Sequence, residues 1–141
     1  MNRTPSSNST TTLLKATQAP TDNSLIYSDE LDCTGYDGGH ATFMIATGDS
    51  GAAADIDSIA IYEATATGGS FSAVTDADFT AVTGANDGTM QIASCQLRSR
   101  KVILKVGYNP GSSNSAAVVI IGQLTGARES NDNSDTYVFE L

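Results

Sequence analysis

Few residues in this sequence have a type and spacing suited to catalysis. His40 is the single histidine, and no serine or cysteine lies in a recognisable nucleophile motif. A triad of the Ser-His-Asp type would therefore have to be assembled from unrelated loops. We expect no catalytic residue in this chain.

Two Asp-x-Asp pairs, Asp55 with Asp57 and Asp76 with Asp78, could supply oxygen ligands to a hard cation such as calcium. Neither pair continues into the acid-rich, glycine-punctuated loop of an EF-hand. Aspartate also initiates turns through its own side chain. We interpret both pairs as solvated turn residues and expect no metal and no cofactor.

Cys33 and Cys95 are the only cysteines, and their separation fits neither a CxxC redox pair nor a zinc-ligand spacing. The chain begins without the apolar core of a secretory signal and has no apolar run that could span a bilayer, so we expect cytoplasmic synthesis and no membrane partner. Cytosolic proteins seldom keep disulfides, which favours two reduced, partly buried thiols. A disulfide is also compatible with the sequence.

Four of the seven basic residues lie within eight positions: Arg98, Arg100, Lys101 and Lys105. On a chain of net charge −9, this cluster could form a positive patch that steers docking onto an acidic partner. It could equally be scatter, with the long side chains covering strand edges. The pI near 4.2 argues against nucleic-acid binding, which needs a surplus of Lys and Arg.

The composition predicts the elements that must position these residues. The 141 residues suit one domain, and 40% are hydrophobic while only 16% are charged. Gly, Ser, Thr, Ala, Asn and Asp are abundant, which is typical of short strands and many turns. About seven or eight strand-like segments, with turns roughly every eight to twelve residues, predict an all-β sandwich or jelly roll. We expect no helix.

The segment from Arg100 to Leu124 is expected to be a hairpin at the centre of the fold, with its turn at Asn109-Pro110-Gly111. Its first half alternates as a half-buried strand does. Its second half, Ala116 to Ile121, is apolar without alternation and predicts a strand covered on both faces. The other expected strands are Leu25–Cys33, His40–Thr47, Asp57–Thr65, Phe71–Val74, Asp76–Thr83, Thr89–Leu97 and a closing strand Asp135–Leu141. Alternation places Phe43 with Ile45 on one face of their strand, and Ile59 with Ile61 on one face of theirs.

Residues 1–24 are rich in Ser, Thr and Asn, and Leu13 with Leu14 is their only sizeable apolar pair. Such a segment cannot bury enough surface to offset its conformational entropy. We therefore expect an extended polar N-terminal arm over residues 1–24, ordered by a partner, and a sandwich domain over residues 25–141.

Three segments in fixed order resemble the capsid decoration, or cement, proteins of tailed bacteriophages. They are a Gly-Tyr-Asp turn leading a strand (Thr34 to Ile45), the stretch IAIYEATATGGSFSAVTDADF (Ile59 to Phe79), and RSRKVILKVGYN followed by SAAVVIIGQL. Together they cover roughly Leu25 to Leu124. The chain departs from the resemblance at its end, because residues 125–141 continue where relatives often stop.

The resemblance implies a non-enzymatic virion protein that binds the outer face of a capsid as a homo-oligomer, with a trimer favoured, and bridges major capsid protein subunits. The arm and the basic cluster would make these contacts. We expect the interface residues to be Arg3, Leu13, Leu14, Lys15, Arg98, Arg100 and Lys101.

Two other functions are compatible with an all-β domain. A carbohydrate-binding or adhesin module of a phage tail or surface protein could use Tyr36, Tyr62 and Tyr108, although the chain has no Trp. A jelly-roll hydrolase is the other alternative, and the single histidine argues against it.

Overall fold

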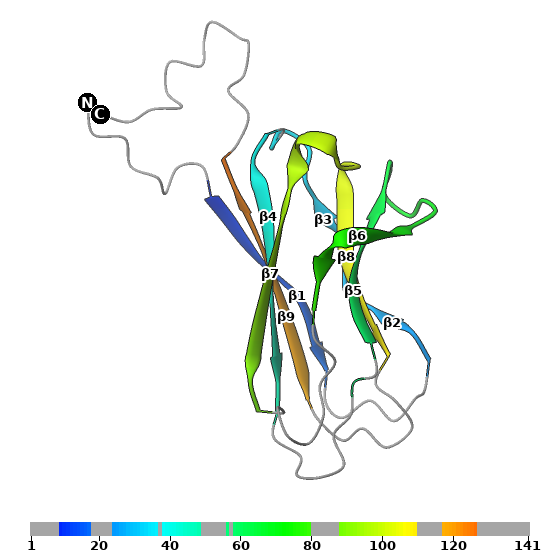
Figure 1. Cartoon of the computed structure of the whole chain (residues 1–141), viewed down its shortest axis with the longest axis vertical. Helices are drawn as coiled ribbons and strands as arrows, with labels where there is room; N and C mark the ends of the chain where they lie inside the picture. The colour runs from blue at the N-terminus through cyan, green and yellow to red at the C-terminus, as the bar shows by residue number, and fades with distance from the viewer. Residues whose placement is uncertain are drawn as a thin grey trace, which may run out of the picture.

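The computed structural model describes residues 9–17, 24–36, 38–48, 56, 58–79, 88–109 and 117–126. Two antiparallel sheets pack face to face in these residues (Figure 1). The expected all-β sandwich is confirmed. The helical structure in these ranges is the short 3-10 turn η2 (Leu97–Ser99), and none of them holds a helix with the length and apolarity needed to cross a membrane.

One sheet has four strands, and the other has five. The order in the first sheet is β1 (Ser9–Thr17), β9 (Val118–Thr125), β4 (His40–Thr47) and β7 (Met90–Gln96). The second sheet contains β2 (Ile26–Tyr27), β3 (Leu31–Asp32), β5 (Ser58–Ala64), β6 (Ser72–Asp78) and β8 (Ile103–Asn109). One edge of β8 pairs with both β2 and β3, and its other edge pairs with β5. The far edge of β5 pairs with β6.

The strand pairs are nested around the turn between β5 and β6. Gly68 in this turn has a φ of 68°, and its backbone N–H donates to the Glu30 carboxylate at 3.1 Å. Outward from the β5–β6 pair, β4 pairs with β7, β2 and β3 pair with β8, and β1 pairs with β9. Each pair joins a strand before this turn to a strand after it, so the chain is one long hairpin wrapped into two sheets.

Side-chain alternation forms the core between the sheets. Phe43 and Ile45 of β4 are buried, as are Ile59 and Ile61 of β5, which confirms the faces predicted for both strands. Tyr108 is the largest of the fully buried side chains. A period of two places one face of each strand inside, and burial of these apolar side chains stabilises the sandwich.

The N-terminal strand corrects the expected arm. Residues 9–17 form β1, which pairs with β9 from Ser9 opposite Thr125 to Thr17 opposite Val118. Leu14 is only 1% exposed and belongs to the core. Polar composition predicted disorder, but a neighbouring strand supplies the backbone partners and one buried leucine supplies the anchor. Residues 9–17 are therefore part of the sandwich; the rest of the expected arm, 1–8 and 18–23, and the expected closing strand Asp135–Leu141 lie outside the described residues.

The expected central hairpin is also wrong, although both of its strands exist. β8 and β9 belong to different sheets and do not pair with each other. The expected double coverage of β9 is wrong as well, because Val118 and Ile120 are buried while Val119 and Ile121 are partly exposed on the outer face. Turn residues predict where the chain reverses, but they do not specify which strand it pairs with afterwards.

Two other boundaries differ from the expected ones. The predicted strand Leu25–Cys33 is split into β2 and β3 at Ser28, whose hydroxyl accepts the Val106 backbone N–H at 3.0 Å. This side chain replaces a backbone carbonyl in the ladder. The two strands predicted around residue 75 are one strand, β6.

Candidate protein-docking surface

The register of the four-stranded sheet brings four large apolar side chains into one row on its outer face. Leu13 of β1 lies opposite Ile121 of β9, Ile121 lies opposite Met44 of β4, and Met44 lies opposite Ile92 of β7. No element of the sandwich in the described ranges packs over this row, and Leu13 and Ile92 are each 59% exposed. The row crosses the full width of the sheet.

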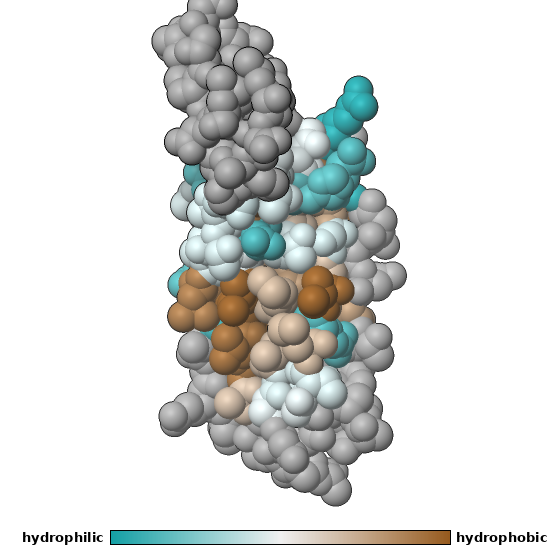
Figure 2. Space-filling model, turned by 90° about the vertical axis from the view of Figure 1, so that its left-hand side faces the viewer, coloured by the Kyte–Doolittle hydropathy of each residue, from teal (hydrophilic) through white to brown (hydrophobic). Residues whose placement is uncertain are grey.

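A second apolar row lies beside the first. Ala46 of β4 has Val119 as its neighbour on β9 and Met90 as its neighbour on β7, and Met90 is 59% exposed. The two rows together form what we term the apolar band: Leu13, Met44, Ala46, Met90, Ile92, Val119 and Ile121. Figure 2 shows this face, with apolar side chains gathered across its middle.

Beyond the band, the same face is polar but uncharged. One row contains Thr11, Gln123, Thr42 and Ser94, and the next contains Ser9, Thr125, His40 and Gln96. The Thr42 and Ser94 hydroxyls lie 2.6 Å apart in a hydrogen bond. None of the outward positions described on these four strands is Asp, Glu, Lys or Arg. An outer sheet face is usually polar and often charged, so this face resembles the core of a protein–protein interface.

The interface residues expected in the arm separate to different places. Leu13 lies in the apolar band, whereas Leu14 is buried in the core and cannot contact a partner. A bulge between Leu13 and Lys15 puts Lys15 in register with the core-facing Ile120, so Lys15 is not part of the outer rows. Arg3 lies outside the described residues.

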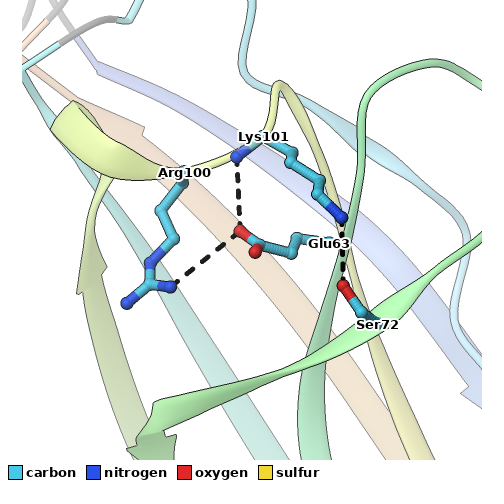
Figure 3. Close-up of polar contacts among 4 residues, drawn as sticks. All are labelled: Glu63, Ser72, Arg100 and Lys101. Atoms are coloured by element: carbon cyan, nitrogen blue, oxygen red, sulfur yellow. Dashed lines mark hydrogen bonds and ion pairs between the residues drawn. The ribbon is translucent and has the colours of Figure 1, made fainter.

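The basic cluster is not a single patch, because Arg100 and Lys101 are held against Glu63 of β5 (Figure 3). Arg100 Nη1 lies 4.0 Å from Glu63 Oε2, and the Lys101 backbone N–H donates to the same oxygen at 3.2 Å. Lys101 Nζ donates to Ser72 Oγ of β6 at 3.1 Å. These contacts tie the chain before β8 to β5 and β6. Arg98 is exposed and remains a candidate contact residue.

Lys105, the fourth basic residue, lies on the outer face of the other sheet. Its Nζ is 4.0 Å from the centroid of the Tyr27 ring and 3.6 Å from that of Phe71. The rings of Tyr27 and Tyr62 meet edge to face with centroids 5.3 Å apart. Gly107 permits this group, since a Cβ there would lie 2.6 Å from Tyr62 Cε2 and 2.9 Å from Tyr27 Cε1.

Only one of the three tyrosines expected on a sugar platform belongs to this aromatic group. Tyr62 does, but Tyr108 is 1% exposed in the core, and the Tyr36 hydroxyl is 2.7 Å from Thr10 Oγ1. The sequence reasoning missed Tyr27 and Phe71. The sequence feature that pointed to this group is Tyr62, which alternation places on the outer face of its strand. In the structure Tyr62 lies opposite Lys105 of β8.

The remaining candidates for chemistry do not converge. His40 is exposed at the polar end of the outer face. Where the structure describes the chain, no three His, Cys, Asp or Glu side chains could hold a metal ion together. Asp55 and Asp57 lie outside the described residues, as do the side chains of Asp76 and Asp78.

Both cysteines are free thiols buried in the core, Cys33 just after β3 in one sheet and Cys95 on β7 in the other. Burial raises the pKa of the Cys33 thiol, and together with the smaller effects of the neighbouring Cys95 and Asp32 it brings this pKa to about 12. Because the thiolate is the nucleophilic form, Cys33 is an inert core residue at neutral pH.

Comparison with known proteins identifies no family, since no protein-family model, curated protein or solved structure matches this chain. The resemblance to capsid decoration proteins therefore stays a prediction.

Proposed function

We propose that this chain is a non-enzymatic structural protein of a virion, which binds the outer face of a phage capsid and stabilises the shell by bridging major capsid protein subunits. The apolar band is the observation that carries this proposal. Large exposed apolar patches mark surfaces that bind protein. Three side chains of the apolar band, Leu13, Met90 and Ile92, are each 59% exposed.

The nested strand pairing supports the same proposal, because the strands of a jelly roll also pair in a nested order. If β2 and β3 count as one interrupted strand, eight strands pair first with last, second with seventh, third with sixth and fourth with fifth. Jelly rolls occur in viral capsid proteins and in lectins, among others. Fold alone does not decide between these functions, so the surface must do so.

The structure changes how such a protein would hold a shell. Residues 9–17 cannot act as a loose arm, because β1 is part of the sheet and Leu14 is in the core. Leu13 instead contributes from a fixed position in the apolar band. A preformed surface loses less conformational entropy on binding than a segment that folds at its partner.

Co-sedimentation with undecorated capsids tests this function. We expect the wild-type protein to be retained and Ile92→Lys to lower its affinity at least about tenfold, because burying an unpaired ammonium group is costly. Ser58→Lys adds the same charge on β5, at an exposed position of the other sheet, and should bind as the wild type does. The proposal fails if the wild-type protein is not retained at low salt or if Ile92→Lys binds equally well.

The aromatic group of Tyr27, Tyr62 and Phe71 supports a second candidate, a carbohydrate-binding module. Sugars stack on exposed aromatic rings, and Tyr27 is 38% exposed. Lys105 already occupies the space over Tyr27 and Phe71, which leaves less free ring surface. A glycan array tests this alternative. Binding that Tyr27→Ala abolishes would favour it over the capsid role.

A further inference from the structure

The outer face of the four-stranded sheet has the properties of a self-complementary surface. Its large apolar row spans all four strands, with Leu13 at one end, Ile92 at the other, and Ile121 with Met44 between them. Among the described residues, the polar rows lie to one side of the band. A two-fold axis that runs parallel to the strands, midway between β9 and β4, would therefore place each row of one copy against the same row of a second copy.

We infer that this face binds a second copy of the chain, in a two-fold dimer packed sheet against sheet. Leu13 of one copy would lie opposite Ile92 of its partner, and Ile121 opposite Met44. Such an interface is isologous, since each contact occurs twice. Packing two sheets through inner apolar faces at about 10 Å is how the sandwich itself is built.

Charge favours a second copy over another occupant. Each chain carries a net charge of −9, so two copies repel each other over most of their surface. The outward positions described on these four strands carry no charged side chain. Two copies can meet here without burying carboxylates. A partner recognised by charge would find nothing on this face to pair with.

The size of the face sets the expected strength. Four strands about 4.8 Å apart, with about seven residues each at roughly 3.4 Å, give a face of about 450 Å² in projection. This lies at the small end of specific interfaces, so we expect a dissociation constant in the micromolar range. The dimer buries the same apolar band that is proposed to contact the capsid, so the two uses compete, and at micromolar affinity the dimer can release monomers that bind the shell. Only the biological meaning of the dimer rests on the proposed capsid role. It replaces the trimer as our proposal for the oligomer.

Sedimentation equilibrium of the purified full chain, without capsids, tests the dimer. We expect twice the monomer mass at concentrations on the order of 100 µM, and a monomer for Ile92→Lys. Ser58→Lys, which carries the same added charge on the other sheet, should remain dimeric. Circular dichroism, and urea unfolding at a protein concentration where the wild type is monomeric, should give wild-type values for both variants. A wild-type monomer, a trimer, or a dimer that Ile92→Lys leaves intact would overturn the inference.

Cysteine cross-linking tests the geometry without depending on a disruptive variant. The variant Leu13→Cys/Ile92→Cys should form a covalent dimer with a short bismaleimide, because these positions face each other across the axis at the sheet separation of about 10 Å, which is too long for a disulfide. The control variant is Thr11→Cys/Met90→Cys, whose two positions lie two rows apart and so do not face each other in the dimer. This control should cross-link at least about tenfold more slowly. Equal rates would overturn the proposed register. Capsid retention of a monomeric wild-type protein would leave the proposed function standing, whereas a dimer that capsids do not retain would remove that function alone.

Discussion

Glu63 shows how one side chain can change the role of a charged cluster. Its carboxylate receives the Lys101 backbone N–H and lies near Arg100, and the two ionic side chains are only 15% and 18% exposed. A partly buried pair with hydrogen bonds resists screening better than an exposed one. Arg100 and Lys101 therefore hold the chain before β8 in place, and Arg98 is left as the exposed arginine of the cluster.

Cys33 gives a pH dependence at the residue scale. Its ordinary pKa of 9.0 rises to about 12 in the folded protein, so the folded state keeps a proton that the unfolded state loses between these values. The stabilisation is fully present below pH 9 and is lost as the pH rises towards 12. We expect the free energy of unfolding to fall over this range, and to fall less steeply in Cys33→Ala.

Urea unfolding at a series of pH values measures this dependence. The quantity compared between the wild type and Cys33→Ala is the slope of the free energy of unfolding against pH, because replacing a buried cysteine also changes the stability at every pH. Parallel curves for the wild type and Cys33→Ala would contradict the assignment of the thiol as a buried neutral group.

At the scale of elements, β1 shows how adjacent residues divide between two functions. Leu14 is buried in the core and Leu13 is 59% exposed on the outer face. Gly122 of β9 makes room for Leu14, since a Cβ there would lie 2.8 Å from Leu14 Cδ1. One strand thus anchors the fold and presents a contact residue.

A pair of alanine substitutions tests this division. Leu14→Ala should lower the free energy of unfolding by about 2 to 5 kcal/mol, because it leaves a cavity in the core. Leu13→Ala should change it by less than about 0.5 kcal/mol. Denaturant unfolding at a protein concentration where only monomers are present makes the comparison. Equally small effects would show that β1 is not part of the folded core, and equally large effects would show that Leu13 is not a surface residue.

At the scale of the whole molecule, the nested strand pairs bring the two ends of the described chain together. Ser9 of β1 lies opposite Thr125 of β9, so the first and last strands lie side by side in the sheet that carries the apolar band. The band therefore requires the complete wrapping of the chain. Any change that releases β1 would remove Leu13 from the band and expose the edge of β9.

Salt distinguishes contacts made through the band from contacts made through basic residues. Two copies that each carry −9 repel at low ionic strength, and salt screens this repulsion. We expect the dimer to strengthen about threefold or more between roughly 10 and 150 mM salt. Sedimentation at several salt concentrations measures the change. A dimer that weakens as salt is added would instead indicate intermolecular ion pairs.

Local pattern was enough to predict the fold class and most strand faces. Alternation identified Phe43 with Ile45 and Ile59 with Ile61 as inward pairs, because a period of two in apolar residues reflects one buried face. Composition predicted an all-β sandwich for the same local reason. The sequence also identified Leu13 as a contact candidate, but only together with Leu14, which is buried.

Pairing partners and outer surfaces were decided by the tertiary structure. Strand pairing depends on contacts between residues far apart in the chain, so a turn between two strands could not show that β8 and β9 lie in different sheets. The apolar band gathers side chains from β1, β4, β7 and β9, none of which is adjacent to another in sequence. No window of sequence contains it, because it exists only where four strands meet in register.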